Sequence, residues 1–87
     1  MTDKTNQSSQ ICRITPTQAR MARAAIKMNK EEIAKATGCA IRTIFHSEHD
    51  ADKISRKNAG VIRSHYEGLG VQFWADAYFH VVAVPKR

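Results

Sequence analysis

Helix-start signals recur at short intervals along the first two thirds of this chain, which leaves no room for a long helix. Thr15 is an N-cap candidate followed by a Pro and, three residues after the cap, by a Gln. Asn29 is followed in the same way by Glu32, and Ser55 is a third cap candidate. The chain is therefore predicted to fold into several short helices.

Four helices are expected from these signals and from apolar residues three or four positions apart. They should occupy residues 15–28, 29–38, 40–48 and 55–70, separated by a loop at residues 49–54 that has no apolar periodicity. The residues expected to face inward are Ala22, Ala25, Ile26, Ile33, Ala34, Thr37, Ala59, Ile62, Tyr66 and Leu69.

After Gly70 the apolar period drops to two, which is typical of strands. Residues 71–74 and 79–84 are rich in β-branched and aromatic side chains and predict a short hairpin. Such a hairpin must pack on the helices or on another chain. The chain is thus divided into a flexible N-terminal arm (1–13), a helical domain (14–70) and a C-terminal hairpin with a basic tail (71–87).

The charge balance indicates a polyanionic partner. The 87 residues carry a formal net charge of +6 and have a pI of about 9.8. Neither a run of apolar residues long enough to span a membrane nor a signal peptide is apparent, so a cytoplasmic protein without membrane association is expected. Cys12 and Cys39 have no CxxC spacing and are expected to be reduced thiols.

Residues 30–49 carry the most specific pattern. Two short helices joined by a Gly turn need a small residue where they cross, a Gly in the turn, and an apolar residue in the angle between them. Ala34, Gly38 and Ile44 occupy these three places. Together with the segments ITPTQARMARAAI, NKEEIAKATG, IRTIFHSE and GVQF, they make residues 14–73 resemble the Cro and lambda-repressor-like (XRE) family of helix-turn-helix DNA-binding domains.

The resemblance implies a mainly α fold of four helices with a short C-terminal β-hairpin, and a sequence-specific transcription regulator of a bacterium or its mobile elements. It further implies a homodimer on double-stranded DNA, with the third helix, at about residues 40–48, in the major groove. Arg23 and Glu48 match the family's buried pair. The implied DNA-binding residues are Lys30, Ala40, Ile41, Arg42, Thr43, Phe45, His46 and His49.

Two of these residues have a clear physical role. Arg42 has the geometry for a bidentate contact with guanine, and Lys30 at a helix start suits a phosphate. The hairpin is the candidate dimerisation surface, with intramolecular packing as the alternative. Its apolar residues are Phe73, Trp74, Phe79, Val81, Val82 and Val84.

Departures from the family pattern support a second function. Ala40 replaces the usual capping Ser or Thr, Lys30 replaces a common Gln, and Ser47 stands at an apolar position. Ile41 and Phe45 would place two large apolar side chains on the reading face, which also suits a protein partner. The alternative is therefore an antagonist that has lost DNA binding and captures a transcriptional activator.

Chemistry beyond binding has little support in the sequence. His46 and His49 lie three residues apart but lack a third ligand at metal-binding spacing. Cys39 with His46 is the only conceivable nucleophile pair, and no phosphate loop or nucleophile elbow is present. The chain is predicted to be neither an enzyme nor a holder of a metal or cofactor.

Overall fold

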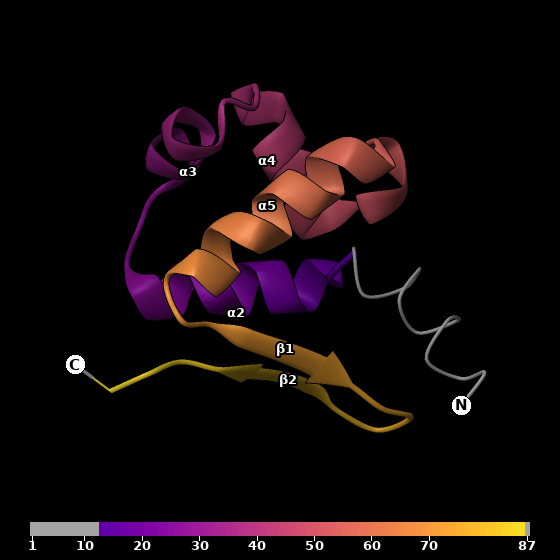
Figure 1. The fold of residues 1–87 in the computed structure, drawn as a ribbon. Coiled ribbons are helices and arrows are strands. Elements are labelled where there is room, and N and C mark those ends of the chain that lie inside the picture. The colour runs from indigo at the N-terminus through magenta and orange to yellow at the C-terminus, as the bar shows by residue number, and fades with distance from the viewer. Residues whose placement is uncertain (1–12, 87) are drawn as a thin grey trace.

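The computed structural model describes residues 13–86; most of the predicted arm and Cys12 lie outside this range. The prediction of a mainly helical chain with a C-terminal hairpin is confirmed. Figure 1 shows the hairpin beneath α2, with α3 and α4 on the opposite side of the molecule. The elements are α2 (Pro16–Ile26), α3 (Lys30–Thr37), α4 (Ile41–His49), the 3₁₀ turn η1 (Ala51–Lys53), α5 (Arg56–Gly68), β1 (Gln72–Ala75) and β2 (His80–Ala83).

The three predicted helix starts are confirmed. The Thr15 hydroxyl accepts a hydrogen bond from the Gln18 backbone N–H, while the Gln18 side chain accepts one from the Thr15 N–H. Asn29 and Glu32 form the same reciprocal capping box at α3. The Ser55 hydroxyl caps α5 by accepting from the N–H of residue 58. These bonds satisfy donors that a helix start otherwise leaves unpaired.

The ends of α2 and α3 are set by left-handed backbone. α2 ends at Ile26, slightly before the predicted end, because Lys27 takes a φ of 62° and turns the chain toward Asn29. α3 ends at Thr37, and the next residue, Gly38, caps it with a φ of 75°, which costs a glycine little. The predicted loop after α4 contains the short turn η1, in which the Asp50 carboxylate accepts from the Asp52 N–H.

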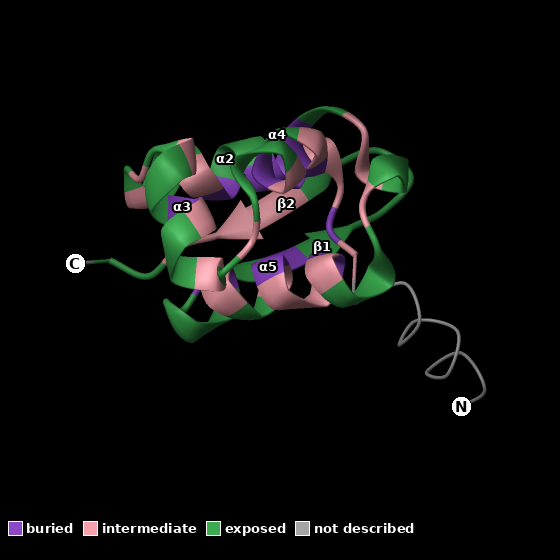
Figure 2. Cartoon of the chain, turned by 90° about the horizontal axis from the view of Figure 1, so that it is seen from above, coloured by how far each residue is buried: buried purple, intermediate pink, exposed green. Residues whose placement is uncertain are grey.

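The core lies where α2, α4, α5 and the hairpin meet, and Figure 2 shows the buried stretches of these helices turned toward the centre. Two residues predicted to face inward, Ala25 and Leu69, are exposed. α2 packs against both α4 and β2, so its buried stripe is centred on Gln18, Ala19 and Ala22 instead. The core cluster is Ile14, Ala19, Ala22, Ile33, Ile44, Ile62, Tyr66, Val71 and Phe73.

The hairpin packs on the helices. β1 and β2 are antiparallel, with Phe73 opposite Val82 and Trp74 opposite Val81. Phe73 is buried and meets Tyr66 in an edge-to-face contact at 6.0 Å between ring centroids. The Gln18 side chain donates to the carbonyl oxygens of Trp74 at 2.8 Å and Val81 at 3.1 Å. One face of the predicted dimerisation surface is thus used inside the chain.

Gly70 makes the close return from α5 into the hairpin possible. Its φ is 92°, and a Cβ at this position would lie 2.8 Å from the Cγ of Pro85. Only a residue without a side chain fits where the C-terminal end of the chain crosses this turn.

His65 on α5 contributes a pH-dependent element to the fold. Its ring is half-buried, and its Nε2 has no hydrogen-bond partner among residues 13–86. Burial lowers the pKa of His65, because the charged imidazolium would lose its solvation.

Acidification is therefore expected to destabilise the protein through His65. Since the pKa in the folded state lies below the unfolded value of about 6.5, the unfolded chain binds more protons between the two values. The free energy of unfolding should fall as pH drops through the unfolded pKa and level off below the folded pKa. Urea titrations of wild type and His65→Leu between pH 8 and pH 5 measure this, and parallel pH profiles would contradict it.

Candidate nucleic-acid interface

The candidate site is built on α3, the turn after it, and α4. Ile33 from α3 and Ile44 from α4 are completely buried between the helices. Ala34 and Cys39 are half-buried and pack against the same core. The three residues predicted to form the junction, Ala34, Gly38 and Ile44, are therefore at the crossing, in the turn and in the angle, respectively.

A buried ion pair anchors the C-terminal end of α4. The Glu48 side chain is 1% exposed, and Arg23 of α2 donates to both of its carboxylate oxygens, at 2.5 Å and 3.0 Å. The predicted contact between these residues is confirmed. The hydrogen bond to Glu48 raises the pKa of the Arg23 guanidinium above its usual range, so Arg23 stays charged.

Two more arginines hold the chain at the end of α4 and in the turn η1 that follows it. Arg20 donates to the backbone carbonyl of Glu48, and Arg13 donates to the carbonyl of Ala51 at 2.5 Å. The Glu48 carbonyl lies in the last turn of α4, where carbonyls lack intrahelical donors, so the Arg20 contact satisfies a group that would otherwise need water. The Ala51 carbonyl lies in η1 and also accepts from the Ile54 N–H. Neither Arg20 nor Arg13 was predicted from sequence. Their partners are 28 and 38 residues away, and nothing local marks such a pairing.

Ser47 fills a core position with a polar side chain. It is buried, and its hydroxyl donates to the Ile44 carbonyl at 2.6 Å. A hydroxyl satisfied within its own helix causes little penalty on burial. The departure from an apolar residue at this position therefore leaves α4 intact.

The opposite face of α4 is open. Ile41 and Phe45 are each 46% exposed, and Arg42 and His49 are exposed beside them. The Phe45 ring stacks on His49 with centroids 4.1 Å apart, and His46 meets the edge of Phe45 at 5.8 Å. Five of the eight predicted DNA-binding residues thus lie on one side of α4: Ile41, Arg42, Phe45, His46 and His49.

The other three predicted residues are Ala40, Thr43 and Lys30. Ala40 is the exposed N-cap of α4 and offers no side-chain hydrogen bond to the helix start. Thr43 is half-buried within the helix, and Lys30 is half-buried in the first turn of α3. Backbone N–H groups at the start of α4 are consequently free of side-chain caps, as an anion-binding helix end requires.

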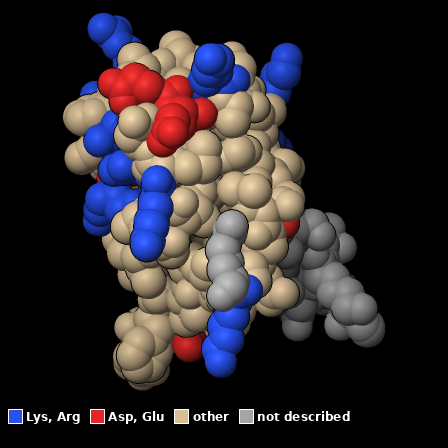
Figure 3. Space-filling model, turned by 90° about the vertical axis from the view of Figure 1, so that its left-hand side faces the viewer, with Lys and Arg blue, Asp and Glu red and all other residues tan. Residues whose placement is uncertain are grey.

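The charge around α3 is mixed rather than purely basic. Figure 3 views the molecule from the left-hand side of Figure 1 and shows a small acidic patch in its upper part, with Lys and Arg side chains around it. Glu31 and Glu32 in the first turn of α3 are exposed beside Lys30. Any polyanion bound here would contact the surrounding cations and avoid these two carboxylates.

A metal site has no set of ligands in the part of the chain that the structure describes. No three His, Cys, Asp or Glu side chains in residues 13–86 gather at one point. Comparison with protein-family models, with curated proteins and with solved structures finds no significant match to this chain. None of the described helices is both long and apolar enough to cross a membrane.

Proposed function

We propose that this protein is a bacterial, cytoplasmic transcription regulator of the Cro and lambda-repressor-like (XRE) type that binds double-stranded DNA as a homodimer. The observation that carries the proposal is the two-sided character of α4. Arg23 and Arg20 anchor its inner side. Arg42 and the stacked rings of Phe45 and His49 face outward. A rigidly held helix with an exposed guanidinium in its first turn suits base recognition in the major groove.

The phosphate backbone supplies the general part of the affinity in this proposal. With a net charge of +6, the chain is attracted to duplex DNA of any sequence. Lys30 and the uncapped start of α4 are the groups best suited to phosphate oxygens. Base contacts from Arg42 would then add preference for one sequence.

Two alanine variants test this division of roles. Arg42→Ala is expected to weaken binding to the preferred duplex by about 1–3 kcal/mol and to leave random duplex almost unaffected. Lys30→Ala should weaken both duplexes equally and reduce the slope of log K against log salt by about 0.9. Fluorescence anisotropy at several salt concentrations, with a duplex selected from a random pool, measures both effects.

The outcomes separate the roles clearly. If Arg42→Ala weakened preferred and random duplex alike, Arg42 would not read a base. If the wild type bound no duplex even at low salt, DNA binding itself would be excluded and the antagonist function would take its place.

The second candidate function is capture of a transcriptional activator by the same face of α4. It is favoured by the exposure of Ile41 and Phe45, which are large, apolar and adjacent. Aromatic side chains of this kind often provide the main binding energy of a protein interface.

The double substitution Ile41→Ser and Phe45→Ser distinguishes the candidates. Both side chains are half-exposed, so the variant should fold, which circular dichroism checks. If the protein is an antagonist, the double variant should bind its activator more weakly by about 2 kcal/mol or more, with no change in its affinity for DNA. A DNA-binding regulator should lose affinity for its preferred duplex. Unchanged binding to both DNA and activator would show that these two residues serve neither function.

A further inference from the structure

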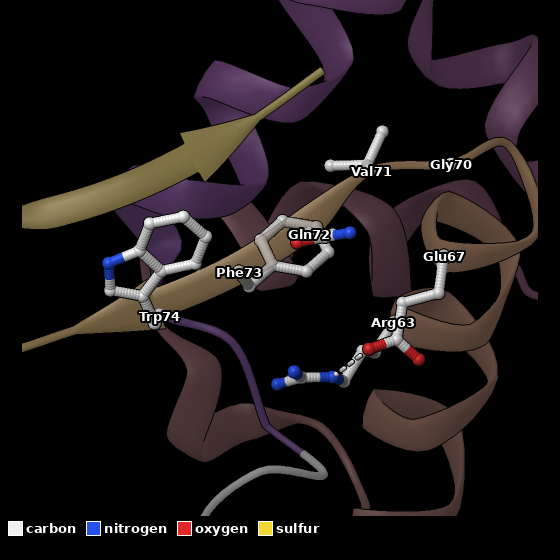
Figure 4. A pocket seen from close by; sticks show the side chains of 7 residues that line it. All are labelled: Arg63, Glu67, Gly70, Val71, Gln72, Phe73 and Trp74. Carbon is white, nitrogen blue, oxygen red and sulfur yellow. Dashed lines mark hydrogen bonds and ion pairs between the residues drawn. The ribbon is translucent and has the colours of Figure 1, made fainter. Parts of the chain in front are cut away.

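Exposed aromatic side chains lie on two surfaces of the described part of the chain, the hairpin and α4. At the hairpin, Trp74 borders a hollow of about 370 Å³ between α5 and β1, which Figure 4 shows from close by. Arg63 and Glu67 line this hollow as an ion pair at 2.7 Å, so an approaching polyanion would meet a carboxylate. On α4, Phe45 is exposed, while the one carboxylate of the helix, Glu48, is buried. The outer side of α4 is therefore the better place for an aromatic ring to meet nucleic acid.

Phe45 lies in the middle of that outer side. Successive residues of an α-helix are about 100° apart around its axis, so Ile41, Phe45 and His49 follow one another along one stripe, with Arg42 beside it. All four are exposed, and the buried residues of the helix lie on its other side. A major groove that receives α4 would meet the two apolar side chains together with the guanidinium.

The Phe45 ring is oriented before any partner binds. It stacks on the His49 imidazole, with ring centroids 4.1 Å apart and ring planes 18° apart. The imidazole is held in turn by its Nδ1, which lies 2.9 Å from the Phe45 carbonyl oxygen and donates to it, because a carbonyl only accepts. An apolar group fixed in this way loses less conformational freedom on binding than a mobile one.

The major groove offers one apolar group to such a surface, the methyl group on C5 of thymine. Its other groups are hydrogen-bond donors and acceptors. A donor or acceptor covered by Phe45 or Ile41 would lose its water without gaining a partner. A methyl group has no hydrogen bond to lose and is stabilised by leaving water. 5-Methylcytosine carries the same methyl group at the same place in the groove.

We propose that Ile41 and Phe45 read the C5-methyl group of pyrimidines beside the base that Arg42 contacts. The inference rests on the proposed function and names the class of base that the apolar part of α4 selects. The exposed apolar pair and the exposed guanidinium, which taken separately suit different partners, then serve a single partner, duplex DNA.

Replacing thymine with uracil tests the methyl contact directly. 2′-Deoxyuridine keeps the base pair and removes only the methyl group, so each thymine of a duplex selected from a random pool is replaced in turn. At a thymine that is read, the dissociation constant of the wild type should rise about three- to tenfold in fluorescence anisotropy. At that position either Phe45→Ala or Ile41→Ala should reduce the effect to within about twofold, since the side chain that covers the methyl group is gone.

Tyr78→Ala is the matched control. It removes an aromatic ring that is 87% exposed on the hairpin and lies outside α4, so the full effect of uracil should remain. The two sources of the methyl group are separated by placing a cytosine–guanine pair at the same position. If 5-methylation of that cytosine tightens binding by the same factor, the methyl group alone is read; if it has no effect, the contact is specific to thymine.

Two results would overturn the inference while the DNA-binding function stands. One is a wild type that prefers its selected duplex but shows no effect of uracil at any position, and this result does not depend on how any variant folds. The other is an undiminished effect of uracil in both Phe45→Ala and Ile41→Ala, with folding checked by circular dichroism. A wild type that binds no duplex at low salt would exclude the proposed function and this inference together.

Discussion

Replacing Arg23 with Ala is expected to lower the free energy of unfolding by about 3–5 kcal/mol. The substitution leaves the Glu48 carboxylate, which is 1% exposed, without the two hydrogen bonds that Arg23 donates. A buried charge without a partner retains its full desolvation cost. Urea unfolding followed by circular dichroism measures the loss.

Replacing the other partner of the pair, Glu48→Ala, is expected to lower the free energy of unfolding by less than Arg23→Ala does. The Arg23 side chain is 24% exposed and also lies 3.4 Å from the Met28 carbonyl, so water and a backbone acceptor remain available to it. A double-mutant cycle over both residues should therefore give a clear coupling energy. Equal losses for the two single variants with no coupling would contradict the anchoring of α4 by this pair.

Ile44→Ala is expected to cost about 2–5 kcal/mol, because it leaves a cavity in the angle between α3 and α4. Ile41→Ala removes the same atoms one turn earlier in the same helix, where the side chain is 46% exposed. That variant should stay within about 0.5 kcal/mol of wild type, since Ala also has the higher helix propensity.

The pair of variants provides its own control, because the chemical change and the helix are identical. Thermal or urea unfolding of both proteins under one set of conditions gives the comparison. Similar losses at the two positions would mean that Ile41 is packed inside and that the outer face of α4 is not the surface described above.

A well-anchored α4 matters for either proposed function. Arg20 and Arg23 act at its C-terminal end, while the residues proposed for recognition lie on its outer face. A helix held at one end by side chains from α2 presents its outer groups in a defined orientation, which reduces the ordering cost of binding.

Local signals in the chain were sufficient to predict the elements. Thr15, Asn29 and Ser55 cap helices as expected, and Gly38 ends one, because capping depends on residues three or four positions apart. The change to an apolar period of two located the hairpin for the same reason. The contact between Arg23 and Glu48 could be predicted only through the family resemblance.

Long-range packing decided the rest. The exposure of Ala25 and the burial of Gln18 depend on where β2 lies against α2, and Gln18 bonds to carbonyls 56 and 63 residues away. Phe73 and Trp74 are neighbours with similar side chains, yet only Phe73 points into the core. Strand alternation predicts that they face opposite ways but not which one faces inward. Packing of the hairpin against the helices determines which of the two is buried, because the helices supply the apolar surface that one side of the hairpin must cover.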